Sequence, residues 1–345
     1  MRAAVLTGIR HFEIKQIPKP EIIHETDVLV RIKMVGICGS DIHYYTQGKI
    51  GTQIVQFPFI MGHEAAGIVE STGKKVSRVK AGQRVVIDPV IACGHCDQCQ
   101  AGRENTCRNL RFLGNPVLLP GMLCEYIVLP ENCCFRISER MTFEQATLSE
   151  PLSIAIYSVE RSRLPDKAKV AILGVGPIGM SIFHVLRTKN IGEIYTTDKI
   201  PARLEFAQKL NPRWCGNPDH SDIVREISDR EPLLLDIVYE CCGDQEALNQ
   251  AVQLLKPGGI LVLVGIPEID QISFSIHELR RKEISIINIS RQAHCTQKAI
   301  DLQEHRQLEI EAMVTHHFPL EETNQAFDLV ANYRDGVMKA MIVVD

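Results

Sequence analysis

The stretch K-V-A-I-L-G-V-G-P-I-G, residues 169–179, decides the fold of the second half of this chain. An apolar strand runs directly into three glycines, Gly174, Gly176 and Gly179, and a helix-like segment follows to about Lys189. An acidic residue, Asp198, ends the next strand about 20 residues further on. Together these features form the dinucleotide-binding fingerprint, in which the glycines permit a tight turn, close approach to a pyrophosphate and close packing of the helix.

The acid at the end of the second strand bears on which dinucleotide binds. The carboxylate of Asp198 would accept hydrogen bonds from the adenosine ribose and repel a 2′-phosphate, which favours NAD over NADP. Two alternatives stand against this interpretation: Asp198 could instead cap the helix near Pro201, and the basic Lys199 could tolerate the phosphate. The candidate cofactor-binding residues are Gly174, Gly176, Pro177, Ile178, Gly179, Asp198, Lys199 and Arg203.

Around this motif the chain alternates apolar strands with helical segments. Strands are expected at residues 169–174, 193–198, 234–240, 260–265 and 283–289, a helix at 201–210 and a turn at 257–259. Because the strands are apolar throughout, both faces of their sheet should be covered. The pattern predicts an α/β domain with a doubly wound parallel sheet over residues 152–289.

A different pattern precedes this domain. The first 35 residues form short alternating runs, A-A-V-L, F-E-I-K and V-L-V-R-I-K-M-V, which predict antiparallel strands of a partly barrel-like domain. The last stretch has two helix-like segments and a final strand, A-M-I-V-V-D, that is suited to rejoin the first sheet. We therefore expect a first domain at residues 1–151 and a second at 152–289, with residues 290–345 returning to the first.

The composition excludes several classes of function. A chain of 345 residues with 45% hydrophobic and 23% charged residues is expected to form two domains of a soluble globular protein. The formal charge of -4 gives no basic surface for nucleic acid. No apolar run is long enough to cross a membrane, and the N-terminus lacks a signal-peptide pattern. We expect a cytoplasmic protein that acts on a small molecule, without nucleic acid or membrane as a partner.

Four of the 12 cysteines lie in one short segment, C-G-H-C-D-Q-C-Q-A-G-R-E-N-T-C, at residues 93–107. Four thiolates close a tetrahedron around zinc and leave no position for a substrate. An iron–sulfur cluster also accepts four cysteines, but its usual spacings differ. The segment therefore predicts a structural zinc site with the ligands Cys93, Cys96, Cys99 and Cys107. The pairs at 133–134 and 241–242 lie in apolar surroundings and are expected to be buried small side chains.

Three further segments carry a second candidate set of metal ligands. Cys38 lies in V-G-I-C-G-S-D, and His63 and Glu64 lie in M-G-H-E-A-A-G. Glu150 opens E-P-L-S, where Pro151 is expected to prevent a regular continuation of the preceding element. A thiolate, an imidazole and carboxylates suit zinc, and three protein ligands with an open position define a catalytic site. Each segment alone is weak evidence, but the combination predicts a catalytic zinc.

Taken in order, these motifs resemble the zinc-dependent medium-chain dehydrogenase/reductase family over essentially the full length. The resemblance is carried by G-H-E-A-A-G followed by five residues and Gly73, by the four-cysteine segment and by G-V-G-P-I-G. C-G-S-D-I-H-Y and E-P-L-S are most similar to the sorbitol (polyol) dehydrogenase branch. The resemblance implies a GroES-like β-barrel catalytic domain around a central Rossmann domain, an active site in the cleft between them, and a dimer or tetramer.

The resemblance also implies roles for the candidate ligands. Cys38 and His63 would bind the catalytic zinc directly. Glu64 would be a ligand or a close neighbour of the ligands, and Glu150 would bind directly or through water, so that the two glutamates could alternate. Asp41 resembles the acid that orients the zinc-bound histidine.

The implied reaction transfers a hydride from a secondary alcohol of a polyol or sugar derivative to NAD, with zinc stabilising the alkoxide. Ser40 resembles the group that takes the proton, and His43 resembles the group that passes it outward. The alternatives are a helix-capping serine and a solvent-exposed histidine. A non-enzymatic dinucleotide-binding sensor is the competing function, but such a protein would be expected to lack some of the zinc ligands.

One departure from the polyol branch concerns the substrate. That branch typically has Arg-Tyr in a late loop, where this chain has Arg291 and Gln292. Arg291 could bind a hydroxyl, a carboxylate or a phosphate, or form an ordinary surface salt bridge. A sugar acid, a threonine-type amino-alcohol or a simple alcohol is therefore an alternative substrate.

Overall fold

The computed structural model describes residues 1–305, 308 and 310–345. The chain divides into two compact units. Unit 1 combines residues 1–150 with residues 293–345, and unit 2 is the continuous segment 151–292. The breaks expected from the sequence were at 151/152 and 289/290.

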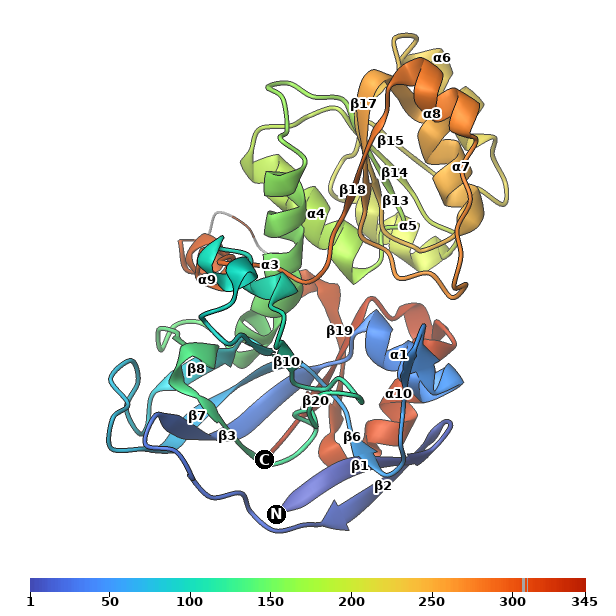
Figure 1. The fold of residues 1–345 in the computed structure, drawn as a ribbon. Helices are drawn as coiled ribbons and strands as arrows, with labels where there is room; N and C mark the ends of the chain where they lie inside the picture. The colour runs from blue at the N-terminus through green and yellow to red at the C-terminus, as the bar shows by residue number, and fades with distance from the viewer. Residues whose placement is uncertain (306–307, 309) are drawn as a thin grey trace. The chain divides into compact units, whose positions relative to one another are not determined.

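The largest sheet of unit 1 is built around one long strand, β3 (Asp27–Gly36). Along one edge β3 pairs antiparallel with β7 (Glu64–Thr72). Along the other edge its first half pairs with β11 (Tyr126–Pro130) and its end pairs with β20 (Lys339–Val343). In Figure 1 the red β20 accordingly lies beside the blue β3. The prediction that the final strand rejoins the first sheet is confirmed.

The other elements of unit 1 complete this sheet or form small sheets around it. The full order of the large sheet is β12-β8-β7-β3-β20-β19, with β11 also on β3, and the small sheets are β2-β1-β6, β10-β9 and β4-β5. The remaining strands are β1 (Arg2–Gly8), β2 (His11–Gln16), β4 (Lys49–Ile50), β5 (Gln53–Ile54), β6 (Phe59–Ile60), β8 (Arg84–Ile87), β9 (Val90–Ile91), β10 (Arg111–Phe112), β12 (Cys134–Arg136) and β19 (Val314–Pro319). The helices are α1 (Gly39–Gln47), α2 (Asp97–Gln100), α9 (Thr296–Glu304) and α10 (Thr323–Ala331), with short 3-10 turns at Glu104–Thr106, Glu131–Cys133, Glu311–Met313, Leu320–Glu322 and Arg334–Gly336.

Three aromatic rings fix α1 and α10 against the core of unit 1. Tyr45 of α1, Phe327 of α10 and Phe12 of β2 lie with ring centroids 4.7–5.6 Å apart. All three side chains are buried. Since burying an aromatic ring is worth about 1.5–3 kcal/mol, this cluster holds α1 in place at the end of β3.

Unit 2 is a six-stranded, fully parallel sheet in the order β15-β14-β13-β16-β17-β18 (Figure 1). Its strands are β13 (Val170–Leu173), β14 (Ile194–Thr197), β15 (Trp214–Gly216), β16 (Leu235–Glu240), β17 (Leu255–Leu263) and β18 (Ser285–Asn288). Its helices are α4 (Pro177–Thr188), α5 (Pro201–Gln208), α6 (Ile223–Arg230), α7 (Gln245–Leu254) and α8 (Ile276–Lys282). In sequence order the strands run 3-2-1-4-5-6, the order of dinucleotide-binding sheets. The predicted doubly wound sheet is confirmed.

Several local expectations were wrong. Pro151 does not end the preceding element, because α3 (Phe143–Arg161) continues through it. Proline inside a helix removes one hydrogen bond and crowds the carbonyl group four residues earlier, and the packing of this long helix outweighs that cost. The turn expected at 257–259 is instead an irregularity within β17, where the register with β16 shifts. Cys242 is exposed rather than buried, whereas Cys133 and Cys134 are buried as expected.

The sequence interpretation had no counterpart for β15, α6, α8, β19 and the short α2, nor for the two-residue strands β4, β5, β6, β9 and β10. Most of these strands are only two or three residues long, so their neighbours in the sheet decide the structure. The helix α6 is different, because its buried Ile223 and Ile227 have a helical spacing that the interpretation did not use. Among the residues that the structure describes, no helix is both long and apolar enough to span a membrane.

Candidate active site

The register of β3 against β7 brings the first set of candidate ligands together. Gly36, the last residue of β3, lies directly opposite Glu64, the first residue of β7. Cys38 follows the end of β3 and His63 precedes β7, so both lie at the same edge of the sheet. One ligand atom from each of Cys38, His63 and Glu64 lies within 4.8 Å of the others. A thiolate, an imidazole and a carboxylate at this separation fit a single zinc ion.

Asp41 orients the histidine of this group. Its Oδ1 lies 3.3 Å from Nδ1 of His63, and its Oδ2 accepts a hydrogen bond of 3.1 Å from the backbone N–H of Cys38. Asp41 is fully buried at the start of α1. Burial lowers the pKa of His63, but the charges of Asp41 and Cys38 outweigh it and raise that pKa well above its ordinary value. With Nδ1 facing Asp41, Nε2 of His63 is the nitrogen available to a metal.

Glu150 is buried near this group without being part of it. It lies on α3, and its carboxylate is not among the ligand atoms that lie within 4.8 Å of one another. Burial raises the pKa of Glu150 to about 8, opposed by the charge of His63 and reinforced by that of Glu64. A buried carboxyl group with this pKa would be stabilised in its charged form by a cation bound beside it.

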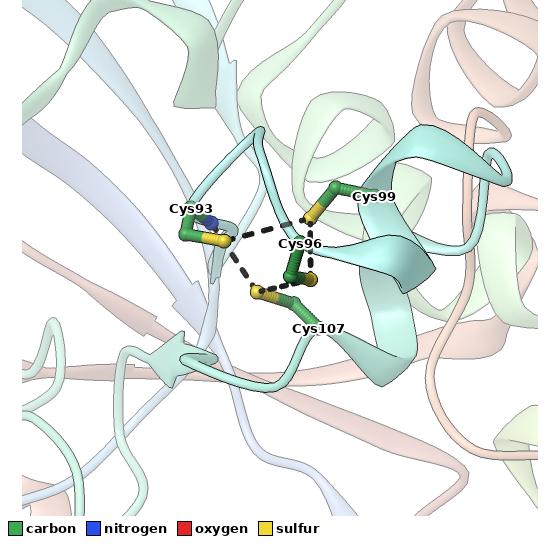
Figure 2. Close-up of side chains that lie close together, drawn as sticks. All are labelled: Cys93, Cys96, Cys99 and Cys107. Carbon is green, nitrogen blue, oxygen red and sulfur yellow. Dashed lines mark hydrogen bonds between the residues drawn. The ribbon is translucent and has the colours of Figure 1, made fainter.

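The four-cysteine segment forms the second candidate metal site. Figure 2 shows the four sulfur atoms turned toward one another. The Sγ–Sγ distances are 3.5 Å for Cys96–Cys99, 3.9 Å for Cys96–Cys107 and 4.0 Å for Cys93–Cys99. Zinc–sulfur bonds of about 2.3 Å in a tetrahedron place the sulfurs about 3.8 Å apart. The arrangement therefore fits a zinc ion with four thiolate ligands.

Hydrogen bonds to the sulfur atoms and the pKa values of the cysteines bear on whether this lobe holds thiolates. The backbone N–H groups of Cys93 and Asn109 donate to Sγ of Cys107, at 3.3 and 3.4 Å. A hydrogen bond from the backbone N–H of His95 lowers the pKa of Cys93 to about 6, whereas burial raises that of Cys99 to about 12. The thiolate of Cys93 is thus favoured at neutral pH without a metal, whereas Cys99 would need a cation bound beside it to be charged.

The glycine loop of unit 2 has the geometry of a pyrophosphate-binding turn. Gly174 has φ +93°, which side chains rarely adopt. A Cβ on Gly179 would lie 2.0 Å from the carbonyl oxygen of Gly174, so only glycine permits this closeness of helix and loop. Gly176 is the N-cap of α4, and Pro177 and Ile178 begin its first turn.

Asp198 follows β14 and lies under this loop. Its Oδ2 accepts a hydrogen bond of 2.8 Å from the N–H of Val175, and its Oδ1 accepts one of 2.8 Å from Ile200. Each carboxylate oxygen has a second lone pair, so the ribose hydroxyls can still be bound. The neighbouring Lys199 is paired with Asp244 at 3.1 Å. A Cβ added to Gly176 would lie 3.1 Å from Nη1 of Arg203, so the guanidinium group lies against the glycine loop.

The remaining predicted residues occupy two places. Ser40 and His43 are half-buried on α1, three positions apart and therefore on one side of the helix. The N-cap of α1 is Cys38, so Ser40 does not cap the helix. Arg291 and Gln292 lie after β18 at the end of unit 2; Arg291 has φ +57° and Gln292 is buried.

Sequence reasoning missed one charged residue beside the first site. Lys339, at the start of β20, is fully buried and forms an ion pair with Glu64. Its signal in the sequence is a lysine within the otherwise apolar run V-M-K-A-M-I-V-V. A charge at such a position calls for a buried partner.

Comparison with known proteins gives concordant results. Residues 24–139 match the alcohol dehydrogenase GroES-like domain, and residues 177–305 match the zinc-binding dehydrogenase family. The chain is 34% identical to a sorbitol dehydrogenase of Bacillus subtilis, over 99% of this chain and 97% of that protein. It is 30% identical to an L-idonate 5-dehydrogenase of Vitis vinifera, over 95% and 91%. A putative zinc-binding dehydrogenase from Sinorhizobium meliloti, solved bound to NADP, superposes with a TM-score of 0.89 at 28% identity, covering 99% and 98% of the two chains.

Proposed function

The chain belongs to the zinc-dependent medium-chain dehydrogenase/reductase family, and on that premise we propose that it oxidises a secondary alcohol of a polyol or sugar derivative with NAD. The observation that carries the proposal is the register of β3 against β7, which brings Cys38, His63 and Glu64 within 4.8 Å. This donor set suits a catalytic zinc, and the four-cysteine lobe suits a structural one.

The residues of unit 1 supply binding, orientation and proton transfer. Cys38 and His63 would hold the catalytic zinc, with a carboxylate from Glu64 or Glu150. The zinc would supply Lewis-acid chemistry that lowers the pKa of a bound alcohol, and NAD would accept the hydride. Asp41 keeps the ring of His63 in the orientation that binding needs.

The proton of the alcohol needs a path to water. Ser40 and His43 lie on one side of α1, directly after Cys38. In the proposed path Ser40 accepts the proton and His43 carries it outward. A hydroxyl can accept one proton as it donates another, and an imidazole has two ring nitrogens through which a proton can pass, as such a relay requires.

The surroundings of Asp198 support NAD over NADP. Its carboxylate is held by two backbone N–H groups, so it cannot turn away from a 2′-phosphate. Lys199, which could tolerate the phosphate, is paired with Asp244 instead. Arg203 and the residues of the glycine loop would contact the rest of the dinucleotide.

The substrate class rests on the relatives and on Arg291 with Gln292. The names of the relatives include a sorbitol and an L-idonate dehydrogenase, one a polyol and one a sugar acid. The guanidinium of Arg291 suits an oxygen-rich substrate. A sugar acid, an amino-alcohol or a simple alcohol is therefore the second candidate. A homodimer or homotetramer in the cytoplasm, with no nucleic acid or membrane partner, completes the proposal by analogy with the family.

The test is NADH formation by the zinc-loaded protein with polyols, sugar acids, threonine and simple alcohols, run in parallel with NADP. Turnover of a polyol with NAD is the expected result. Turnover of a sugar acid alone would support the same hydride transfer to NAD, with a sugar acid as the substrate in place of a polyol. No turnover of any alcohol, with zinc and NAD both bound, would refute the enzymatic proposal in favour of a dinucleotide-binding sensor.

A further inference from the structure

A buried lysine faces the candidate zinc site from the last strand. Only 2% of the surface of Lys339 is exposed. Its Nζ donates a hydrogen bond of 2.9 Å to the carbonyl oxygen of Ile37 and forms an ion pair with Oε2 of Glu64, whose side chain is equally buried. A buried ammonium group is costly even when paired, and an apolar side chain could fill the same space. Packing alone therefore does not account for a lysine here.

The backbone opposite this pair leaves room for it. Gly36 ends β3 directly opposite Glu64. A Cβ on Gly36 would lie 2.3 Å from Oε2 of Glu64 and 3.1 Å from Cε of Lys339. Any side chain at residue 36 would displace the carboxylate or the lysine stem. Three separate segments, β3, β7 and β20, thus cooperate to hold this ion pair.

Two cations could bind Glu64: the ammonium group of Lys339 and a metal ion held by Cys38 and His63. A carboxylate oxygen of Glu64 lies within 4.8 Å of the ligand atoms of Cys38 and His63, so it can reach a metal that they bind. The same carboxylate is paired with Lys339. Zinc with four protein ligands has no position for a substrate, whereas zinc with three has one. The ion pair between Lys339 and Glu64 therefore affects whether the metal ion keeps a coordination position for the substrate.

We propose that Lys339 is a positioning residue that binds Glu64 and so keeps its carboxylate out of the open coordination position. The inference rests on the proposed function in the form in which Glu150 is the carboxylate ligand, because it presupposes a metal ion that Cys38, His63 and Glu150 hold and that Glu64 does not bind. It goes beyond that function because it states that a residue of the last strand, β20, determines which side chains coordinate the metal ion. Neither residue needs to touch the substrate for this role.

The test uses the cobalt(II)-loaded protein, with imidazole as a probe for an open coordination position. Imidazole adds only where a position is open, so the four-thiolate site does not contribute to the imidazole-dependent change in the visible spectrum. Lys339→Met should weaken imidazole binding about tenfold or more, the effect typical of losing a group that orients a metal ligand. Lys339→Arg keeps the cation and should bind imidazole within about twofold of the unaltered protein.

The double variant Lys339→Met/Glu64→Gln separates this role from packing. If the released Glu64 blocks the position, its neutralisation should restore imidazole binding to within about twofold, as expected for two coupled residues. A defect that persists in the double variant, or imidazole binding in Lys339→Met equal to that of the unaltered protein, would overturn the inference.

Glu64→Gln alone keeps the inference testable if Lys339→Met does not fold. With Glu64 already held by Lys339, this change should alter imidazole binding by less than about twofold. A gain of about tenfold or more would mean that Glu64 occupies the position in the unaltered protein, and would refute the role of Lys339. If the unaltered protein shows no imidazole-dependent spectrum at all, the metal site itself is wrong, and with it the proposed function.

Discussion

Replacing Gly179 with alanine should separate α4 from the glycine loop and weaken dinucleotide binding. The added Cβ would lie 2.0 Å from the carbonyl oxygen of Gly174, whereas real Cβ contacts shorter than 3.0 Å essentially never occur. Because the obstacle is backbone, helix and loop must move apart by about 1 Å. Forcing an extra methyl group into a packed position costs about 1–3 kcal/mol of unfolding free energy.

The same shift moves the first N–H groups of α4 away from the pyrophosphate. The favourable interaction of an anion with a helix N-terminus is worth up to about 2 kcal/mol. Losing about 1–2 kcal/mol corresponds to a five- to thirtyfold weaker affinity for NADH. Zinc content should not change, since both metal sites lie in unit 1.

The assay combines a fluorescence titration with NADH and an unfolding titration in urea. Gly192→Ala is the matched control, because it adds the same methyl group to unit 2 with no atom within 4 Å of the new Cβ. The control should match the unaltered protein in both titrations. If Gly179→Ala behaves like Gly192→Ala, the reasoning about the glycine loop fails.

Three further predictions concern single side chains. Cys38→Ser should abolish turnover and lower the zinc content by one ion per chain while NADH affinity stays within about twofold, and turnover at the unaltered rate would contradict the catalytic-zinc assignment. Asp198→Asn removes the charge that would repel a 2′-phosphate, so the ratio of kcat/KM for NADP to that for NAD should rise about tenfold; an unchanged ratio would place the discrimination elsewhere. Burial raises the pKa of Glu231, but its contacts with Lys169 and Tyr195 lower that pKa by more, so the net shift is a decrease. This carboxylate therefore stabilises the fold above the pKa of about 4.3 that it has in the unfolded chain, and the effect is lost as the pH falls through its lower pKa in the folded protein. Glu231→Gln should lower the free energy of unfolding by about 1–3 kcal/mol at pH 7 and by less at pH 4, as measured by urea titration. An equal loss at both pH values would contradict the role of this carboxylate.

The features that sequence predicts well in this chain are short and local. Gly174 and Gly179 are close in sequence, and their conformational demands exclude other residues, so the pattern points to one structure. The four cysteines lie within residues 93–107, and a short segment with four thiol groups most often folds around a metal ion, so the spacing alone predicts the site. The apolar strands of unit 2 are equally clear, because a fully buried strand leaves no polar alternation.

Pairings between distant segments could not be predicted in the same way. The contact between Lys339 and Ile37 joins residues 302 positions apart, and neither local pattern contains a sign of the other. The strand β19 is half-exposed and polar in part, so only its parallel pairing with β20 makes it a strand. Pro151 shows the converse, since a strong local signal for interruption is overridden by the packing of α3.

The sharing of β3 between β11 and β20 has a consequence for biosynthesis. Unit 2 is one uninterrupted segment, so it can fold as soon as the ribosome has produced it. The sheet of unit 1 cannot, because β3 must wait for β20 across some three hundred intervening residues, a closure that is slow for entropic reasons. Until then Glu64 lacks Lys339, and the edge of β3 that leads to Cys38 is unpaired. A nascent chain should therefore acquire its dinucleotide fold early and a working metal centre only once residues 339–343 have been added.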